Sequence, residues 1–348
     1  MGIVTIIGSG MMGSALAFPA AENGHEVRLV GSPLDHEVID ICKKTNRHPK
    51  FDTDFPANVS YYYVEQMEEA IKGADMVIGG VSSFGVDWFG DVVLPAVPES
   101  TPVLTVTKGL MNTEDGRLLT YPELWEKRLS EKGLKRSLSA IGGPCISFEL
   151  VWHDYTEVAF CGKDMKTLEF LKSMMATEYY HISLTTDVTG IESAVALKNG
   201  YALGIALTIG LNEKKYGNDK LHYNSQAALF GQSVKEMARL LKYQGADDLN
   251  DLCIGAGDLY VTVYGGRTRQ IGILLGEGYD IDEAVEKMNG VTLESLVVAD
   301  RVAKAVTKAS EKGLLNREDF PVLFHIDAIM NEKKNAAIPW ESFTYVQE

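Results

Sequence analysis

Three glycines near the start of the chain constrain its fold more than any other feature. They stand in Gly8-Ser9-Gly10-Met11-Met12-Gly13, which follows the apolar run Ile3–Ile7 and precedes a helix-like stretch, residues 14–23. In this spacing the first glycine permits a tight turn, the second lets a phosphate approach the backbone, and the third lets helix and strand pack closely. The pattern predicts a dinucleotide-binding turn at a helix N-terminus. A glycine-rich turn without a ligand is the alternative.

Two nearby features modify this prediction. Pro19 should kink the helix or end it early, because proline has no N–H to donate. An acidic residue often follows the second strand in NAD-binding domains, where it binds the ribose hydroxyls. Here the strand ends in Val30-Gly31-Ser32-Pro33, with neither an acid nor an arginine for a 2′-phosphate. Asp35 could serve from the loop, so NAD is slightly favoured and NADP stays possible.

The pattern of apolar runs divides the chain into two parts. Short β-rich runs alternate with helix-like stretches in the first half, which indicates a parallel sheet covered on both faces. The predicted strands are Ile3–Ile7, Glu26–Val30, Met76–Val81, Val103–Val106, Leu138–Ile141 and Val158–Phe160. Long amphipathic patterns then take over. We therefore predict an α/β dinucleotide-binding domain over residues 1–187, a helical domain over 188–334 and a C-terminal tail over 335–348.

Charge and composition exclude several classes of protein. The 348 residues include 33 Lys and Arg against 48 Asp and Glu, a formal net charge of −15. A general nucleic-acid or anionic-membrane binder would need the opposite sign. No apolar run approaches the roughly 20 residues of a membrane span, and the N-terminus has no basic segment typical of a signal peptide. Four cysteines without C-x-x-C spacing favour free thiols in a cytoplasmic protein.

Three further blocks carry polar residues in positions suited to chemistry. Thr107-Lys108-Gly109-Leu110 places a lysine at the carboxyl end of a predicted strand, the edge where ligands bind in such sheets. Lys198 lies on an otherwise apolar helix, where it needs a partner or a ligand unless it reaches the surface. Gly265-Gly266-Arg267 precedes another helix and could hold a phosphate, or could be a surface turn with a solvated arginine.

Taken in order, these blocks resemble the NAD(P)-dependent glycerol-3-phosphate dehydrogenases. The resemblance covers residues 2–331 and is most specific in the TKG, LKN and GDL blocks, at residues 107–109, 197–199 and 257–259. It implies a Rossmann-type doubly wound, mostly parallel sheet. An all-α substrate domain, like the C-terminal domain of 6-phosphogluconate dehydrogenase, would follow in a homodimer. The implied reaction is reversible hydride transfer between nicotinamide and C2 of dihydroxyacetone phosphate, supplying glycerophospholipid synthesis.

The resemblance also implies roles for individual residues. Lys198 would be the general acid/base, Lys108 would lie near the same oxygen, and Asp258 would orient the Lys198 ammonium. The implied substrate-binding residues are Lys108, Gly143, Asn199, Thr262, Gly266, Arg267 and Thr268. The implied cofactor-binding residues are Gly8, Gly10, Met11, Met12, Gly13, Ser32, Lys108, Ser147 and Arg267. Metal-binding spacings such as H-E-x-x-H do not occur, so we expect no metal.

Several positions depart from the family pattern. Thr268 stands where the family usually has Asn, Met12 replaces an aromatic residue, and Cys145-Ile146-Ser147 replaces Ser-Phe-Ala. The stretch Leu150–Glu157 replaces a Gly-Leu-Pro-Thr segment. A related dehydrogenase acting on another polyol or ketose phosphate therefore stays open as an alternative, as does a nucleotide-binding regulator without catalysis.

Overall fold

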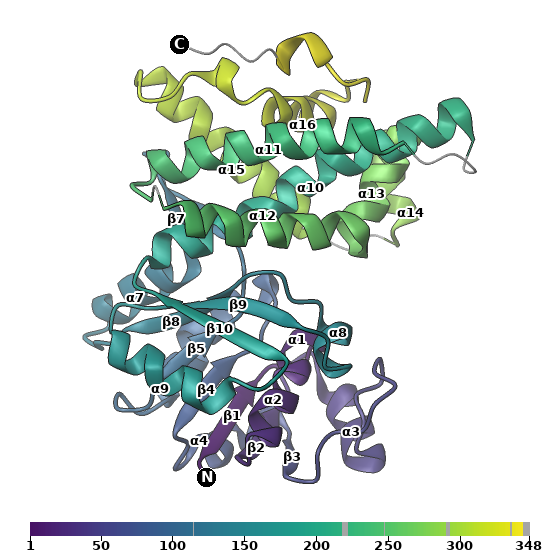
Figure 1. Cartoon of the computed structure of the whole chain (residues 1–348). Coiled ribbons are helices and arrows are strands. Elements are labelled where there is room, and N and C mark those ends of the chain that lie inside the picture. The colour runs from purple at the N-terminus through teal and green to yellow at the C-terminus, as the bar shows by residue number, and fades with distance from the viewer. Residues whose placement is uncertain (114, 218–221, 247, 290–292, 335, 344–348) are drawn as a thin grey trace. The chain divides into compact units, whose positions relative to one another are not determined.

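The chain forms two compact units in the computed structural model (Figure 1). The structure describes residues 1–113, 115–217, 222–246, 248–289, 293–334 and 336–343. Unit 1 comprises Met1–Lys108 and Tyr121–Glu192, and unit 2 comprises Gly109–Thr120 and Ser193–Glu348. The short segment 109–120, which the sequence analysis placed in the first domain, thus packs with unit 2. Of the predicted tail, residues 335 and 344–348 lie outside the described residues.

Unit 1 is built on one eight-stranded sheet (Figure 1). Its strand order is β10-β9-β8-β5-β4-β1-β2-β3, and every pairing is parallel except that of β8 with β9. The strands are β1 (Ile3–Ile7), β2 (Glu26–Val30), β3 (Val59–Tyr62), β4 (Met76–Gly79), β5 (Val103–Thr105), β8 (Leu138–Gly142), β9 (Thr156–Cys161) and β10 (Tyr180–Thr185). This is the predicted Rossmann-type sheet, with β3 and β10 as edge strands that the sequence analysis missed.

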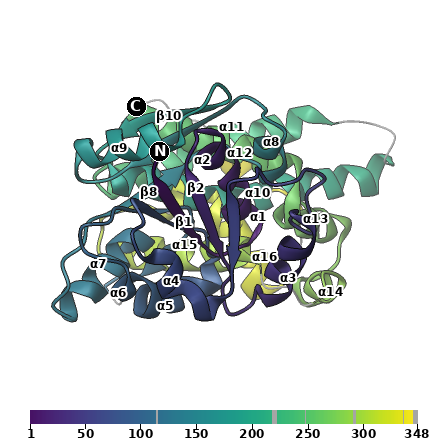
Figure 2. The same cartoon turned by 90° about the horizontal axis from the view of Figure 1, so that it is seen from below.

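Helices cover both faces of this sheet. They are α1 (Met11–Ala15), α2 (Ala17–Glu22), α3 (His36–Thr45), α4 (Met67–Ile71), α5 (Val86–Trp88), α6 (Leu94–Ala96), α7 (Tyr121–Glu131), α8 (Ser147–Val151) and α9 (Met165–Met175). Figure 2 shows α2 and α9 above strands β1, β2 and β8, with α4 and α7 below them. The first predicted helix is broken at Leu16, three residues before Pro19, which cannot donate to the carbonyl of Ala15.

The described residues of unit 2 form helices, one hairpin and the loops that connect them. Its helices are α10 (Val188–Tyr216, whose first five residues belong to unit 1), α11 (Tyr223–Tyr243), α12 (Leu249–Tyr264), α13 (Gly266–Glu277), α14 (Ile281–Lys287), α15 (Glu294–Glu311) and α16 (Pro321–Glu332). The hairpin pairs β6 (Leu110–Asn112) with β7 (Leu118–Thr120), and Leu110 and Leu118 join the core of the helices. These two leucines explain why the segment belongs with unit 2.

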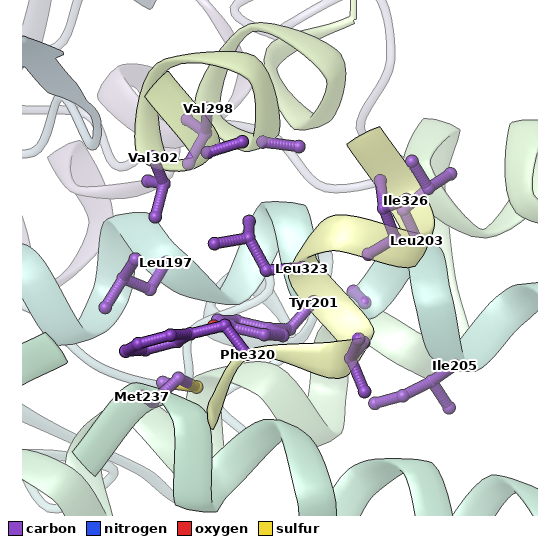
Figure 3. Close-up of a cluster of buried hydrophobic side chains, with 14 of the residues drawn as sticks. Leu197, Tyr201, Leu203, Ile205, Met237, Val298, Val302, Phe320, Leu323 and Ile326 are labelled. Atoms are coloured by element: carbon purple, nitrogen blue, oxygen red, sulfur yellow. The ribbon is translucent and has the colours of Figure 1, made fainter. Parts of the chain in front are cut away.

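Helix α10 runs through the core of unit 2. Figure 3 shows Leu197, Tyr201 and Leu203 of this helix among side chains from neighbouring segments, including Leu323 of α16 and Phe320, which directly precedes α16. A stretch of α10 is long and apolar enough to cross a membrane, but 83% of it is buried inside the structure. This corrects the expectation that no such stretch exists, and the burial identifies α10 as a core helix of the unit.

A buried carboxyl group holds the start of α16. Glu236 of α11 is fully buried and accepts hydrogen bonds from the backbone N–H groups of Val322 (2.9 Å) and Leu323 (3.1 Å). The Gln232 amide donates a third hydrogen bond, of 3.1 Å. These backbone groups lie in the first turn of α16, where N–H donors have no acceptor within the helix. Burial raises the pKa of Glu236 to about 7, although these hydrogen bonds act in the opposite direction.

Replacing Glu236 should destabilise the protein. Glu236→Ala leaves the Val322 and Leu323 N–H groups without an acceptor, so the free energy of unfolding should fall by about 2–4 kcal/mol in urea titrations. Because the folded-state pKa is raised to about 7, this group's contribution to stability is complete below its unfolded pKa and is lost as the pH rises through 7. Glu236→Gln should therefore reduce the loss of stability between about pH 5 and 8 by roughly 2–3 kcal/mol. An unchanged pH dependence would contradict this assignment.

Candidate functional site

The glycine turn is shaped for a ligand at its middle position. A side chain at Gly8 would bring its Cβ within 2.8 Å of Gly80, and one at Gly13 within 2.1 Å of the Gly8 carbonyl oxygen. A Cβ at Gly10 would meet nothing closer than 4.0 Å. Gly8, with φ of 108°, and Gly13 therefore serve the turn and its packing, whereas Gly10 leaves open space beside the backbone. This geometry fits the approach of a pyrophosphate.

The turn lies at the point where the strand order reverses. β1 pairs with β2 on one side and with β4 on the other, and ligands bind at such switch points in doubly wound sheets. Gly80, directly after β4, touches both Gly8 and Gly13 across this point. The role of this glycine was not predicted from the sequence, although Gly79-Gly80 after an apolar strand is a visible signal. Met11 and Met12 follow the turn in the first turn of α1, half-buried against the core.

The Asp35 side chain is hydrogen-bonded to the glycine turn. Its Oδ2 accepts hydrogen bonds from the backbone N–H groups of Ser9 (3.2 Å) and Ser32 (2.9 Å). The carboxylate thus links the ends of β1 and β2, where the cofactor ribose binds in dinucleotide-binding domains. His48 is buried beside Ser9, and its burial lowers the pKa of the imidazole. The sequence analysis missed His48, whose position depends on the fold of the loop after α3.

Lys108 is held in place by the loop after a neighbouring strand. Its Nζ donates a 3.1 Å hydrogen bond to the carbonyl oxygen of Gly143. Lys108 follows β5 and Gly143 follows β8, and these two strands pair in parallel. Gly143 has φ of 134°, and a Cβ there would lie 3.1 Å from the Cα of Val158. A glycine is therefore needed to present this carbonyl group to Lys108.

The segment after Gly143 contacts other parts of unit 1. Ser147, a predicted cofactor residue, begins α8 and is buried. The Trp152 indole donates to Asp52 (2.9 Å), and His153 is 2.9 Å from Glu22. Tyr155 stacks on His181 with ring centroids 4.8 Å apart. These contacts give the unusual side chains of residues 152–155 a structural role on the surface of unit 1.

A buried ion pair joins two helices of unit 2. The Lys198 ammonium on α10 contacts Oδ1 of Asp258 on α12, and the two side chains are 12% and 1% exposed. An unpaired lysine at such a site would be costly to bury, so the pairing resolves the alternatives that the sequence left open in favour of a partnered lysine. Asp258 is the predicted partner.

Close packing of α10 and α12 brings the pair together. A Cβ on Gly255 would lie 2.7 Å from the Cβ of Ala194, so only glycine permits the two helices to approach this closely. Gly255 lies three residues before Asp258 on α12, and Ala194 lies four residues before Lys198 on α10. Each is about one helical turn from the ion pair, so this contact fixes the separation that the pair requires.

Two other predicted substrate residues lie close to this pair along the same helices. Asn199 follows Lys198 and is 9% exposed. The Thr262 hydroxyl donates a 2.7 Å hydrogen bond to the backbone oxygen of Asp258, which places it one turn further along α12. These two side chains are among the substrate-binding residues that the family resemblance implies.

The Gly-Gly-Arg turn begins α13. Gly266, with φ of 81°, is the first residue of the helix, and Arg267 is exposed in its first turn with Thr268 beside it. The first backbone N–H groups of a helix have no acceptor within it, so an anion can bind there together with an arginine. Arg269 has a different role, because its Nη1 donates to the Val263 carbonyl at the end of α12 (3.1 Å).

The predicted residues thus form two groups, one in each unit. The glycine turn, Ser32, Lys108, Gly143 and Ser147 belong to unit 1, and the Lys198–Asp258 pair, Asn199, Thr262 and residues 266–268 belong to unit 2. Unit 1 offers an open glycine turn and a lysine at the carboxyl ends of its strands, which suits a dinucleotide. Unit 2 offers a buried lysine with its carboxylate and an arginine at a helix N-terminus, which suits proton transfer and anion binding.

Comparison with protein families identifies both parts of the chain. Residues 3–168 match the N-terminal model of NAD-dependent glycerol-3-phosphate dehydrogenase, and residues 187–340 match its C-terminal model. The chain is 33% identical to an NADP(+)-dependent glycerol-3-phosphate dehydrogenase of Archaeoglobus fulgidus, over 92% of this chain and 95% of that protein. It is 30% identical to an NAD(P)(+) glycerol-3-phosphate dehydrogenase of Bacillus velezensis, over 89% of this chain and 85% of that protein.

Solved structures share the fold. A glycerol-3-phosphate dehydrogenase from Plasmodium falciparum superposes with a TM-score of 0.83 at 19% identity, covering 99% of this chain and 96% of that one. The enzyme from Saccharomyces cerevisiae gives 0.78 at 21% identity, covering 99% of each chain. The two family models and the relatives confirm the resemblance. The chain belongs to the family of NAD(P)-dependent glycerol-3-phosphate dehydrogenases, which are oxidoreductases that act on a CH–OH group.

Proposed function

We propose that this protein reversibly reduces dihydroxyacetone phosphate to glycerol 3-phosphate. The observation that carries the proposal is the buried Lys198–Asp258 pair, because an ammonium held at such a site by a carboxylate suits proton transfer to a carbonyl oxygen. The names of the relatives point to the same reaction. We infer that residues 1–187 bind the dinucleotide and that residues 188–334 bind substrate and supply the proton.

Each group has a defined task in this reaction. The bound nicotinamide would supply the hydride to C2 of the substrate. Lys198 gives its proton to the carbonyl oxygen, and Asp258 holds the ammonium in position through a charge-assisted hydrogen bond. Lys108 provides positive charge for the developing alkoxide. The α13 N-terminus with Arg267 and Thr268 binds the phosphate, while Asn199 and Thr262 border the reacting carbon.

We further propose the setting in which the enzyme works. A homodimer in the cytoplasm, supplying glycerol 3-phosphate for phospholipid synthesis, is what membership of the family suggests. NAD is the favoured cofactor, because the Asp35 carboxylate lies where a 2′-phosphate would bring further negative charge.

One alternative has a specific observation in its favour. Thr268 stands at the start of α13, beside Arg267, where the family usually has an amide side chain. A threonine hydroxyl donates one hydrogen bond, whereas an amide donates two. A dehydrogenase of another ketose phosphate is therefore the second candidate. A regulator without catalysis is less favoured, because the buried ion pair serves no purpose in binding a nucleotide.

The first experiment follows the absorbance of NADH and NADPH during incubation with dihydroxyacetone phosphate and a panel of larger ketose phosphates. We expect turnover of dihydroxyacetone phosphate to be the fastest. Activity on a larger ketose phosphate alone would support the second candidate. Cofactor binding without turnover of any phosphate would support the regulator.

Lys198→Ala should lower kcat by roughly 10²–10⁴-fold, because the general acid is lost. It should also destabilise the fold, because Asp258 is left buried without its counter-ion. Adding Asp258→Asn should recover stability in urea titrations without recovering turnover, which separates chemistry from folding. Lys215→Ala, at an exposed position on the same helix, is the control. Near-normal turnover of Lys198→Ala would refute the proton-transfer role.

Arg267→Ala should weaken binding of the phosphate specifically. Loss of a charged hydrogen bond of about 1.5–3 kcal/mol corresponds to a rise in KM of roughly 10- to 100-fold for dihydroxyacetone phosphate. The kinetics with unphosphorylated dihydroxyacetone should change far less. Gln270→Ala, at an exposed position on the same helix, should change neither. Equal effects of Arg267→Ala on both substrates would contradict a phosphate-binding role.

Asp35→Asn should shift cofactor preference toward NADPH. The amide oxygen can still accept hydrogen bonds from Ser9 and Ser32, but the repulsion of a 2′-phosphate is removed. Removing about 1 kcal/mol of repulsion would raise the ratio of kcat/KM for NADPH over NADH by roughly fivefold, and less at high salt. An unchanged ratio would show that the Asp35 charge does not set this preference.

A further inference from the structure

A cluster of three ionisable groups lies in unit 1 around the first turns of α10. Glu192, in the second turn of the helix, is 1% exposed, and no group of the described residues donates a hydrogen bond to its Oε2. Lys108, after β5, and Glu123, on α7, both act electrostatically on this carboxyl group. The proposed reaction assigns a role to Lys108 but none to Glu192 or Glu123.

The positions of the two neighbours are fixed by separate contacts. Lys108 donates a hydrogen bond to the Gly143 carbonyl oxygen, and this bond restrains the position of its ammonium group. Glu123 accepts a 3.0 Å hydrogen bond from the hydroxyl of Thr189. Thr189 lies three residues before Glu192, on the same face of α10, so this bond holds the second carboxyl group on that face. Glu192 is therefore buried where one neighbour favours its charge and the other opposes it.

This setting keeps the carboxyl group neutral over much of the ordinary pH range. Burial is the largest cause and raises the pKa of Glu192 to about 8; the positive charge of Lys108 opposes the rise, and the negative charge of Glu123 adds to it. A buried acid with an oxygen that accepts no hydrogen bond loses stability when it ionises. Such perturbed groups occur often at functional sites, though structural networks produce them too.

We propose that Glu192 is a positioning residue that acts through Lys108, and that the charge of its carboxyl group changes the positive electrostatic potential at the Lys108 ammonium group. This rests on the proposed function, in which Lys108 stabilises the developing alkoxide. When Glu192 is neutral, it does not reduce the stabilisation of the alkoxide by Lys108. When Glu192 releases its proton to solvent, the new carboxylate compensates the ammonium, and stabilisation of the alkoxide weakens. Rising pH should therefore slow the reduction through Glu192.

The pH profile of kcat/KM for reduction tests this coupling. The wild type should lose activity above about pH 8 with the slope of a single proton, and Glu192→Gln should lack that inflection. Glu123→Gln keeps an oxygen for Thr189 but removes a negative charge, so its inflection should move to lower pH by less than one unit. Glu131→Gln, which removes an exposed charge from the same helix α7, should leave the profile unchanged.

A purely structural role would lower the rate of Glu192→Gln equally at every pH and leave the inflection in place, which would overturn the proposal. If Glu192→Gln fails to fold, an unshifted inflection in Glu123→Gln overturns it equally.

Infrared spectroscopy of the wild type provides a readout independent of turnover. A protonated carboxyl band that titrates near pH 8 should be present in the wild type and in Glu236→Gln, which removes the other buried acid of raised pKa. If the variant folds, the band should be absent when Glu192→Gln is combined with Glu236→Gln. Wild type that shows this band but does not turn over dihydroxyacetone phosphate would refute the proposed function alone. Wild type that turns over the substrate without the band would refute the role of Glu192 alone.

Discussion

The buried ion pair between Lys198 and Asp258 sets the demands that the rest of unit 2 meets. Removing an ammonium and a carboxylate from water costs several kcal/mol per ion, and only close contact offsets that cost. The two helices that carry the pair must therefore approach closely and stay rigid. Gly255 against Ala194 provides the approach, and the apolar side chains around α10 provide the rigidity. The apolar side chains of α10 thus belong to the core that holds one charged side chain in a fixed place.

Glycines also permit close approach in unit 1, where backbone segments meet instead of two helices. Gly8, Gly13 and Gly80 let three backbone segments meet at the switch point of the sheet, and Gly10 leaves its space to a ligand. In an acidic chain with a net charge of −15, an anionic ligand needs local donors. Backbone N–H groups supply such donors without adding charged side chains, and a helix N-terminus does so again at α13.

The sequence predicts some of this architecture for physical reasons. Central parallel strands are buried on both faces and appear as continuous apolar runs, so β1, β2, β4, β5, β8 and β9 were found. The two missed strands of the large sheet, β3 and β10, are its edges, where polar and apolar residues mix. The glycine turn was predictable because its constraints are local. The partner of Lys198, 60 positions away, came from the family resemblance, since no local pattern encodes a tertiary contact. His48, Gly80 and the packing of residues 109–120 likewise depend on contacts distant in sequence.

Three buried carboxyl groups are stabilised in different ways against the free-energy cost of burial. Asp258 has a lysine, and Glu236 has the backbone N–H groups of a helix terminus. Glu192 has charged neighbours on other elements but an oxygen to which no described group donates. A carboxylate with a fixed counter-charge, such as Asp258, serves as a positioning group. An acid whose neighbours oppose each other can change its charge near neutral pH. Stability alone would favour replacing such an acid with an apolar residue, which is why its presence near Lys108 argues for a role in the reaction.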